Sequence, residues 1–251
     1  MSFYGPPVEA LGRFVHHLGD AINIYKANNI SYWAGDNVIA LARRFSFSRD
    51  QPFCAAFAKH AGPDDDSKMW RIATYCWAIR SAFGAKGDLV ECGVFKGFYA
   101  GVAVDYLDLD RTGRTFYLYD TFEGLDAEFS GEHARNTLNP HYATPFYDEV
   151  ARRFAPYRNV RIVKGVVPTI LNEVAPADVA FLHLDMNAGQ AEHEALEFFW
   201  PRIPVGGVVL ADDFGRAEHD VYDALSVWAK HVGHAFLELP TGQGLLFKTH
   251  V

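Results

Sequence analysis

The sequence predicts an α/β fold in which a mostly parallel sheet follows a helical N-terminal segment. From Asp88 onward, short runs rich in β-branched and aromatic residues alternate with helical patterns, an order typical of parallel sheets. The runs are almost continuously apolar, which indicates strands buried on both faces. The change of character near residue 86 divides the chain into residues 1–85 and residues 86–251.

The segment 1–85 is expected to be helical and to contribute contacts to the substrate or to another subunit. Apolar residues recur in it at helical spacing, as at Ile72, Tyr75 and Ile79. The predicted helices cover residues 8–27, 36–45, 52–61 and 66–83.

The segment 86–251 is expected to form the sheet and the helices that cover it. Two final runs, 234–240 and 244–251, flank a glycine-containing turn and are predicted to pair antiparallel at a sheet edge. The other predicted strands cover residues 88–92, 115–120, 160–165, 179–185 and 206–213, and the helices cover 98–107, 146–155, 191–203 and 221–232.

The composition argues against several classes of protein. With 251 residues, of which 49% are hydrophobic and 22% charged, the chain has an ordinary globular composition. Its net charge of −8 disfavours nucleic-acid binding, and no apolar run approaches the length of a membrane span. The three cysteines lack zinc spacing and cannot all pair, and the start of the chain lacks a signal-peptide pattern. We therefore expect a cytoplasmic protein that binds neither nucleic acid nor membrane.

The segment ECGVFKG, residues 91–97, follows the first predicted strand, where open α/β sheets bind their ligands. A dinucleotide site is the obvious interpretation, but the spacing is GxxxG rather than GxGxxG. The carboxylate of Glu91 would also face a pyrophosphate with like charge. S-adenosylmethionine (SAM) has no phosphate and carries a cationic ammonium and sulfonium, which a carboxylate attracts. We therefore predict a SAM site that includes Glu91, Gly93, Val94, Phe95 and Gly97.

A second acid supports this interpretation. Asp120 closes the next predicted strand, where it is placed to accept hydrogen bonds from ribose hydroxyls. The alternative is that Gly93 and Gly97 merely allow a helix to pack on a strand, since so short a pattern is a weak signal by itself.

Three more carboxylates close two other predicted strands. Asp185 ends the run 179–185, and Asp212 and Asp213 end the run 206–213. If these strands are neighbours, the carboxylates converge beside the cofactor, and an all-oxygen set of this kind suits Mg²⁺. The metal would acidify and orient an acceptor hydroxyl for methyl transfer to oxygen. The acids at the end of either strand, taken alone, have another explanation. Asp is a common N-cap residue, and Asp213 could simply cap the helix that follows it.

Asp185 is also the candidate general base, because little basicity is needed once a metal has acidified the hydroxyl. His183 lies two residues earlier on the same face of the strand and is an alternative base. A buried histidine that is simply hydrogen-bonded is the plainer interpretation of His183. His219 is a weaker candidate at the mouth of the site.

Two further segments are candidates for acceptor binding. The run 127–147 is rich in His, Asn, Tyr and Thr and has little periodicity, which is typical of a binding loop or lid and equally of a surface loop. Tyr32 and Trp33 are candidates to line an acceptor pocket, although core packing or an oligomer contact is the simpler interpretation.

Five pieces of the chain, in order, resemble one family. They are LVECGVFKG, YLYDTFEGL, FLHLDMN, GGVVLADDFG and LPTGQGLLFK, and they fall within residues 86–249. Together they resemble the class I SAM-dependent methyltransferases of the TylF/MycF/NovP type, the macrocin O-methyltransferase family. The resemblance implies a Rossmann-like, seven-stranded sheet with a reversed last strand and commonly a homo-oligomer. It also implies transfer to a hydroxyl, usually of a sugar on a larger molecule.

The resemblance also implies roles for individual residues. SAM would be bound by Glu91, Gly93 and Asp120 with the neighbouring Thr121 and Phe122, and the turn Gly165-Val166 would lie near adenine. Mg²⁺ would be held by Asp185, Asp212 and Asp213. The chain departs from the family at Asn187, where many members have a second acid two residues beyond the metal aspartate.

The sequence therefore favours a Mg²⁺-dependent SAM O-methyltransferase that acts on a small-molecule or glycan hydroxyl. Two alternatives remain: an oxidoreductase that uses an NAD-type dinucleotide, and a non-catalytic protein that binds SAM.

Overall fold

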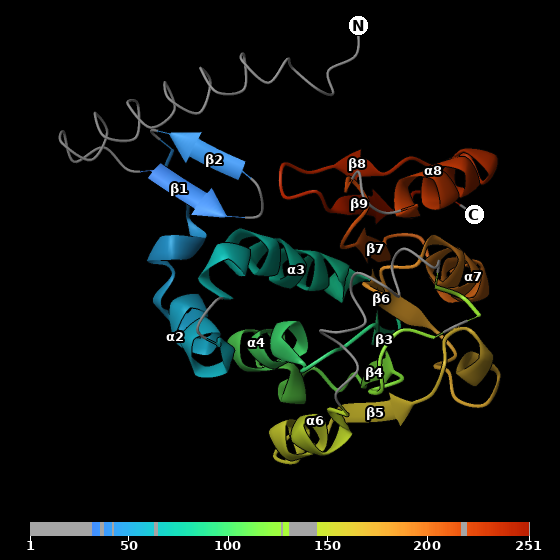
Figure 1. Ribbon diagram of the computed structural model, residues 1–251, viewed down its shortest axis with the longest axis horizontal. Coiled ribbons are helices and arrows are strands. Elements are labelled where there is room, and N and C mark those ends of the chain that lie inside the picture. Colours follow the sequence, from blue (N-terminus) through green and yellow to red (C-terminus); the bar gives the residue numbers. More distant parts are fainter. Residues whose placement is uncertain are drawn as a thin grey trace, which may run out of the picture.

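A seven-stranded sheet lies at the centre of the computed structural model (Figure 1). The model describes residues 32–35, 38–41, 43–62, 65–126, 128–130, 145–216 and 220–250. The strand order is β5-β4-β3-β6-β7-β9-β8, and β9 alone runs antiparallel to its two neighbours. The predicted mostly parallel sheet with a reversed last strand is confirmed. The strands are β3 (Asp88–Cys92), β4 (Phe116–Asp120), β5 (Val160–Lys164), β6 (Val179–Leu184), β7 (Val208–Ala211), β8 (Leu237–Glu238) and β9 (Gly244–Phe247).

Helices cover both faces of this sheet, with α2, α3, α4 and α6 on one side and α7 and α8 on the other (Figure 1). Successive strand residues point to opposite faces, so the sheet has two cores. Leu89 packs in the core under α2 to α4, and its neighbour Val90 packs in the core under α7 and α8. The helices are α2 (Gln51–His60), α3 (Met69–Ser81), α4 (Phe98–Tyr106), α6 (Tyr147–Phe154), α7 (Gly189–Phe199) and α8 (Val221–His231).

Short 3₁₀ turns complete the described elements. They are η1 (Phe47–Arg49), η2 (Asp65–Lys68), η3 (Ala82–Gly84), η4 (Leu109–Arg111), η5 (Thr169–Asn172) and η6 (Trp200–Arg202). None of the helices in the described ranges is both long enough and apolar enough to cross a membrane.

The N-terminal segment differs from its prediction at residues 36–45. A helix was predicted there, but β1 (Tyr32–Gly35) and β2 (Val38–Leu41) pair antiparallel in register Gly35↔Val38. The physical reason lies in the sequence: two short apolar runs flank Asp36-Asn37, residue types that favour turns, and Val38-Ile39 is β-branched. The predicted helix 8–27 lies outside the described residues.

The two other predicted N-terminal helices are confirmed as α2 and α3, and both pack on the sheet. Asp50 caps α2 by accepting a hydrogen bond from the N–H of Phe53 (3.2 Å). Phe53 of α2 and Tyr75 of α3 are fully buried in the same core as Leu89 of β3. The division of the chain at residue 86 stays a prediction.

The carboxyl ends of the central strands meet at one edge of the sheet. The backbone N–H of Asp185 donates to the carbonyl of Cys92 (2.9 Å), and that of Asp212 donates to the carbonyl of Leu184 (2.8 Å). These bonds extend the parallel ladders by one residue beyond β6 and β7. The backbone of Asp185 and of Asp212 is thereby held by the sheet itself.

Candidate active site

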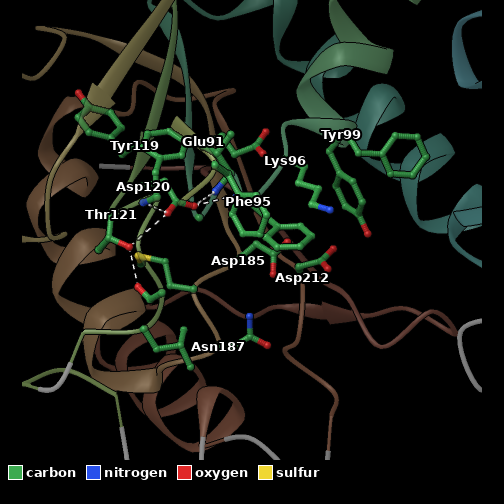
Figure 2. A pocket seen from close by; sticks show the side chains of 18 of the residues that line it. Glu91, Phe95, Lys96, Tyr99, Tyr119, Asp120, Thr121, Asp185, Asn187 and Asp212 are labelled. Atoms are coloured by element: carbon green, nitrogen blue, oxygen red, sulfur yellow. Dashed lines mark hydrogen bonds between the residues drawn. The ribbon is translucent and has the colours of Figure 1, made fainter. Parts of the chain in front are cut away.

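A cavity of about 630 Å³ opens at this edge of the sheet. In Figure 2, Asp120 and Thr121 lie on one side of the view and Asp185 and Asp212 on the other, with Phe95 between them. Of the predicted cofactor and metal residues only Gly97 is absent from the lining, which includes Glu91, Gly93, Val94, Phe95, Asp120, Thr121, Phe122, Gly165, Val166, Asp185, Asp212 and Asp213.

The glycine-rich turn after β3 requires glycine at two positions for different reasons. Gly93 has φ +90°, and a Cβ there would collide with the carbonyl of Asp185, so glycine lets β3 and β6 end in close contact. Gly97 has φ +74° and is the N-cap of α4, where a Cβ would lie 2.6 Å from the Phe154 ring. Gly97 therefore allows α4 and α6 to approach closely, and its contact with the cofactor stays a prediction.

Asp120 ties the turn to the end of β4. One carboxylate oxygen accepts the backbone N–H groups of Val94 (2.6 Å) and Phe95 (2.8 Å), and the other accepts that of Phe122 (2.7 Å). A carboxylate has about four lone-pair sites, so three of them order the loops on both sides of the cavity. Contact of Asp120 with a ribose stays a prediction.

Glu91 is almost fully buried at the floor of the cavity. The hydroxyl of Tyr75, which projects from α3, donates a short hydrogen bond to its Oε2. On the other side, Nδ1 of His183 lies 3.8 Å from the same oxygen. The carboxylate is thus held in one orientation by groups that the sheet and α3 provide.

His183 lies beneath the floor and is absent from the cavity lining. It is fully buried, Tyr75 packs edge-on against it at 4.7 Å, and its Nε2 lies 3.7 Å from Oδ1 of Asp212. Burial lowers the pKa of His183, but the carboxylates of Asp212 and Glu91 outweigh burial and raise the pKa to about 10. At neutral pH the ring is therefore protonated and has no free lone pair with which to act as the general base.

The acidic edge brings Asp185 and Asp212 together. Oxygen atoms of these two residues and a ring nitrogen of His183 all lie within 4.8 Å of one another. Loss of water contact and the negative charges of Asp212 and Asp213 raise the pKa of Asp185 well above its usual range. Burial also acts to raise the pKa of Asp212, but Arg71 and His183 more than offset this and hold that pKa well below its usual range.

Arg71 is the site residue that sequence reasoning missed. It is buried on α3, its Nη1 donates to Oδ2 of Asp212 and lies 3.4 Å from Oδ1 of Asp213, and its Nη2 donates to the carbonyl of Thr241 (2.9 Å). Arg216 binds the same Oδ1 of Asp213 at 2.8 Å. These arginines supply the counter-charge that three acids at two strand ends require.

A signal for this role was present in the sequence. Arg71 and Tyr75 lie four residues apart, so they share one face of α3, and that face is otherwise apolar. Polar groups on a buried stripe need partners, and here the partners are Asp212 and Glu91 of the site.

Several candidate residues fall outside the described part of the chain. His219 and most of the run 127–147 are among them, and the side chains of Tyr32 and Trp33 are not described. Asn187, where the chain departs from the family pattern, lines the cavity with φ +55°.

Comparison with known proteins identifies the family. The model of the family described as macrocin-O-methyltransferase (TylF) matches residues 71–232, more than half of the chain. The chain belongs to the TylF family. This match confirms the resemblance carried by the five motifs, and it begins at Arg71 on α3 rather than at β3.

Two curated relatives of this TylF-family chain are named as O-methyltransferases. One, from Streptomyces olivaceus, is 8-demethyl-8-(2,3-dimethoxy-alpha-L-rhamnosyl)-tetracenomycin-C 4'-O-methyltransferase, 30% identical over 56% of this chain and 58% of the relative. The other is demethyldecarbamoylnovobiocin O-methyltransferase from Streptomyces niveus, 29% identical over 51% of this chain and 53% of the relative. The matches thus span little more than half the length of these relatives.

Solved structures share the fold. The O-methyltransferase NovP superposes with a TM-score of 0.64 at 22% identity, covering 72% of this chain and 81% of that chain. The SAH-bound Podospora anserina methyltransferase PaMTH1 superposes with a TM-score of 0.53 at 11% identity, covering 100% of both chains. At these identities the likeness establishes the class I methyltransferase fold.

Proposed function

We propose that this chain is a SAM-dependent O-methyltransferase that transfers a methyl group to a hydroxyl, most simply that of a sugar in a glycan or glycosylated natural product. The observation that carries the proposal is that Glu91, the glycine turn after β3 and the acids that follow β6 and β7 all line one cavity. TylF membership and the names of the curated relatives support it.

In the proposed cofactor site, Glu91 attracts the cationic methionine end of SAM. Asp120 already orders Val94, Phe95 and Phe122, and we propose that it also accepts hydrogen bonds from the ribose. We place adenine near Thr121, Phe122, Gly165 and Val166, which line the same cavity. When bound, SAM supplies an electrophilic methyl that moves to the acceptor oxygen and leaves S-adenosylhomocysteine (SAH), while the hydroxyl proton passes to a base.

The residues at the acidic edge fit a divalent cation. Asp185 and Asp212 offer oxygen donors within reach of one another, and burial together with the charges of Asp212 and Asp213 raises the pKa of Asp185, a shift that a bound cation would oppose. Asp213 is the third proposed ligand, although its Oδ1 contacts Arg71 and Arg216. Bound Mg²⁺ would lower the pKa of the acceptor hydroxyl.

Asp185 is the proposed catalytic base. It is half-buried at the cavity floor, whereas Asp212 is held ionised by Arg71 and His183. Burial and the charges of Asp212 and Asp213 hold the pKa of Asp185 high; a bound cation would lower it and leave an ionised Asp185 able to accept the proton of the acceptor hydroxyl. His183 does not compete for this role, because it is charged and lies below the lining.

Turnover tests the proposal. Purified protein is incubated with methyl-labelled SAM and a panel of rhamnosylated and glucosylated acceptors, sugar 1-phosphates and nucleoside-diphosphate sugars, with Mg²⁺ or with EDTA. We expect label in an acceptor ether, loss of turnover in EDTA, and loss of turnover in Asp185→Asn with SAH binding retained. Full activity of Asp185→Asn in EDTA would contradict the metal mechanism, and no transfer to any acceptor despite SAH binding would favour a non-catalytic SAM-binding protein.

We also propose that the protein is a cytoplasmic homo-oligomer. The reducing-type cysteine pattern and the family resemblance support this proposal. Light scattering of the purified chain measures its assembly state, and a monomer at micromolar concentration would contradict the oligomer.

A further inference from the structure

Besides the arginines that bind Asp213, three cationic side chains line the cavity. Lys68 comes from η2, Lys96 from the turn before α4, and Arg153 from α6. Lys68 is neutralised by Asp65 at 2.9 Å, so it adds little net charge.

Lys96 has no carboxylate partner within the described ranges. Its Nζ lies over two aromatic rings instead, 5.5 Å from the centroid of Phe95 and 5.1 Å from that of Phe146. Figure 2 shows the ammonium between Phe95 and Tyr99, on the side of the view where Asp185 and Asp212 lie. The attraction of an ammonium to aromatic faces is weak at exposed sites, and this contact leaves the N–H donors of Lys96 available to a ligand.

Arg153 is the second cation. Its charge contributes to the lowered pKa of Asp65, but no carboxylate of the described residues lies within salt-bridge distance of it. Its Nη1 lies 3.3 Å from Nδ1 of His60 and 3.4 Å from the His60 carbonyl. Burial lowers the pKa of His60, so a neutral ring faces the guanidinium and only part of the five-donor fork is used.

Lys96 and Arg153 belong to the same end of the cavity. A Cβ placed on Gly97, the residue after Lys96, would lie 3.5 Å from Cδ of Arg153. The turn after β3 therefore packs directly against the arginine of α6. Glu149, one turn earlier on α6, also lines this end and sets a negative charge against the two cations.

The cofactor accounts for one of these cations at most. SAM has no phosphate, and its single anionic group is the methionine carboxylate, while its ammonium and sulfonium are matched by Glu91. The chain as a whole carries a net charge of −8, so its general field repels anions. Two cations inside the cavity of such an acidic chain would bind an anionic group of a ligand. The aromatic faces beside them suit a sugar ring, so the ligand expected here carries both an anionic group and a sugar.

We propose that the acceptor is a phosphorylated sugar, whose phosphate or diphosphate is bound by Lys96 and Arg153 while its hydroxyl faces Asp185. The inference rests on the proposed methyltransferase function and adds the chemical class of the acceptor. A sugar 1-phosphate and a nucleoside-diphosphate sugar both present this group.

Calorimetric titration of the SAH-saturated protein tests the inference. The probes are inorganic pyrophosphate, glucose 1-phosphate, UDP-glucose and uridine, each at low and at physiological salt. We expect the three phosphate-bearing probes to bind, more weakly at higher salt, and uridine not to bind. Tighter binding of UDP-glucose than of glucose 1-phosphate identifies a nucleotide-linked acceptor, and the reverse order identifies a sugar phosphate.

Variants assign the binding to the two cations. Lys96→Met and Arg153→Gln should each weaken phosphate binding at least about tenfold, the scale of one lost charge-assisted hydrogen bond, and Lys96→Arg should restore it. Glu149→Gln should tighten binding, because it removes an opposing charge. Arg152→Gln, on the exposed side of the same helix, is the matched control and should bind as the wild type does.

The outcomes separate the two levels of the proposal. If the wild type binds SAH but none of the phosphate probes, or if Lys96→Met and Arg153→Gln bind them as tightly as the wild type, the inference is wrong and the methyltransferase proposal stands. If uridine binds as well as UDP-glucose, recognition is by the base, and the inference is also wrong. If the wild type does not bind SAH, the proposed function itself fails.

Discussion

At the scale of single residues, the site is organised by an ion pair that bridges two parts of the chain. Arg71 donates to Asp212, and Gln243 donates to the other oxygen of the same carboxylate at 2.8 Å. Arg71 and Asp212 are both almost fully buried. Removal of one partner of such a pair leaves an uncompensated buried charge, which costs far more than the pair itself contributes.

Arg71→Met should therefore destabilise the fold by about 3 kcal/mol or more. The free energy of unfolding is measured by urea denaturation at neutral pH. The control is Arg111→Met, which breaks the exposed 3.1 Å pair with Asp108 and should change stability by less than about 1 kcal/mol. Equal effects of the two substitutions would show that the Arg71–Asp212 pair does not hold the site.

The same ion pair predicts a pH dependence. The folded-state pKa of Asp212 lies below its unfolded value, so ionised Asp212 stabilises the fold above the unfolded pKa, and this stabilisation is lost as the pH falls. Asp212→Asn does not titrate. The stability advantage of the wild type over Asp212→Asn should therefore shrink as the pH is lowered from about 6 to about 3. A difference that stays constant over this range would contradict a depressed pKa.

Gly93 provides a third test at this scale. Gly93→Ala places a Cβ against the carbonyl of Asp185 as well as forcing φ +90° on alanine, so we expect a loss of roughly 3 kcal/mol. Gly113 also has positive φ, but a Cβ there meets nothing within 4 Å. Gly113→Ala should cost only about 1 kcal/mol in the same urea measurement. Similar losses would mean that the close approach of β3 and β6 is not required.

At the scale of elements, α3 and α7 support the site from opposite faces of the sheet. Helix α3 sends Arg71 to Asp212 and Tyr75 to Glu91. Helix α7 sends the buried Glu192 to the loop after β6, where its Oε1 accepts the N–H of Met186 (3.0 Å). Each helix thus fixes a segment that carries proposed catalytic groups.

Glu192 predicts a pH effect of opposite sign. Burial, then the charge of Asp213, raises the pKa of Glu192 to about 8. When the folded-state pKa of a carboxyl group is raised, the protonated group contributes its full stabilisation below the unfolded-state pKa. This contribution is lost as the pH rises toward the folded-state pKa. Glu192→Gln keeps the acceptor for Met186 without titrating. Its stability relative to the wild type should rise by about 3 kcal/mol between pH of about 5 and about 8, as measured by urea denaturation. No change with pH would contradict the raised pKa.

The elements also show which predictions a sequence can support. The central strands β3, β6 and β7 were predicted because each is a buried apolar run bounded by turn residues, and the helices because their periodicity is local. The hairpin at residues 32–41 was missed because four-residue apolar runs do not distinguish strand from helix. The sequence predicts Gly97 as a cofactor residue. In the structure Gly97 lies next to the ring of Phe154, and no local sequence pattern indicates this contact, because it depends on how α6 packs against the start of α4.

At the scale of the whole molecule, the site lies where several segments distant in sequence converge. Residues at strand ends, such as Asp120 and Asp185, were predictable because the position of a strand end follows from the pattern of the strand itself. The apolar face of α3 indicates that Arg71 needs a buried partner, but the identity of that partner was not predictable, because Arg71 and Gln243 reach Asp212 across 141 and 31 residues of chain. A local pattern does not indicate which residues meet across that separation.

The whole cavity also has a consistent distribution of charge. Glu91 lies at the proposed sulfonium end, Asp185, Asp212 and Asp213 lie at the proposed metal, and Lys96 and Arg153 line the same cavity. A pyrophosphate in the position of SAM would face the buried carboxylate of Glu91. The charge pattern therefore separates a SAM site from a dinucleotide site at the same place in the fold.

Calorimetric titration with SAH and with NAD tests the central claim most directly. The account predicts that SAH binds to the wild type with one site per chain, that NAD does not bind, and that Glu91→Gln weakens SAM binding more than the control Glu173→Gln, which is exposed. Tight binding of NAD without binding of SAH would contradict the assignment and would favour a dinucleotide oxidoreductase.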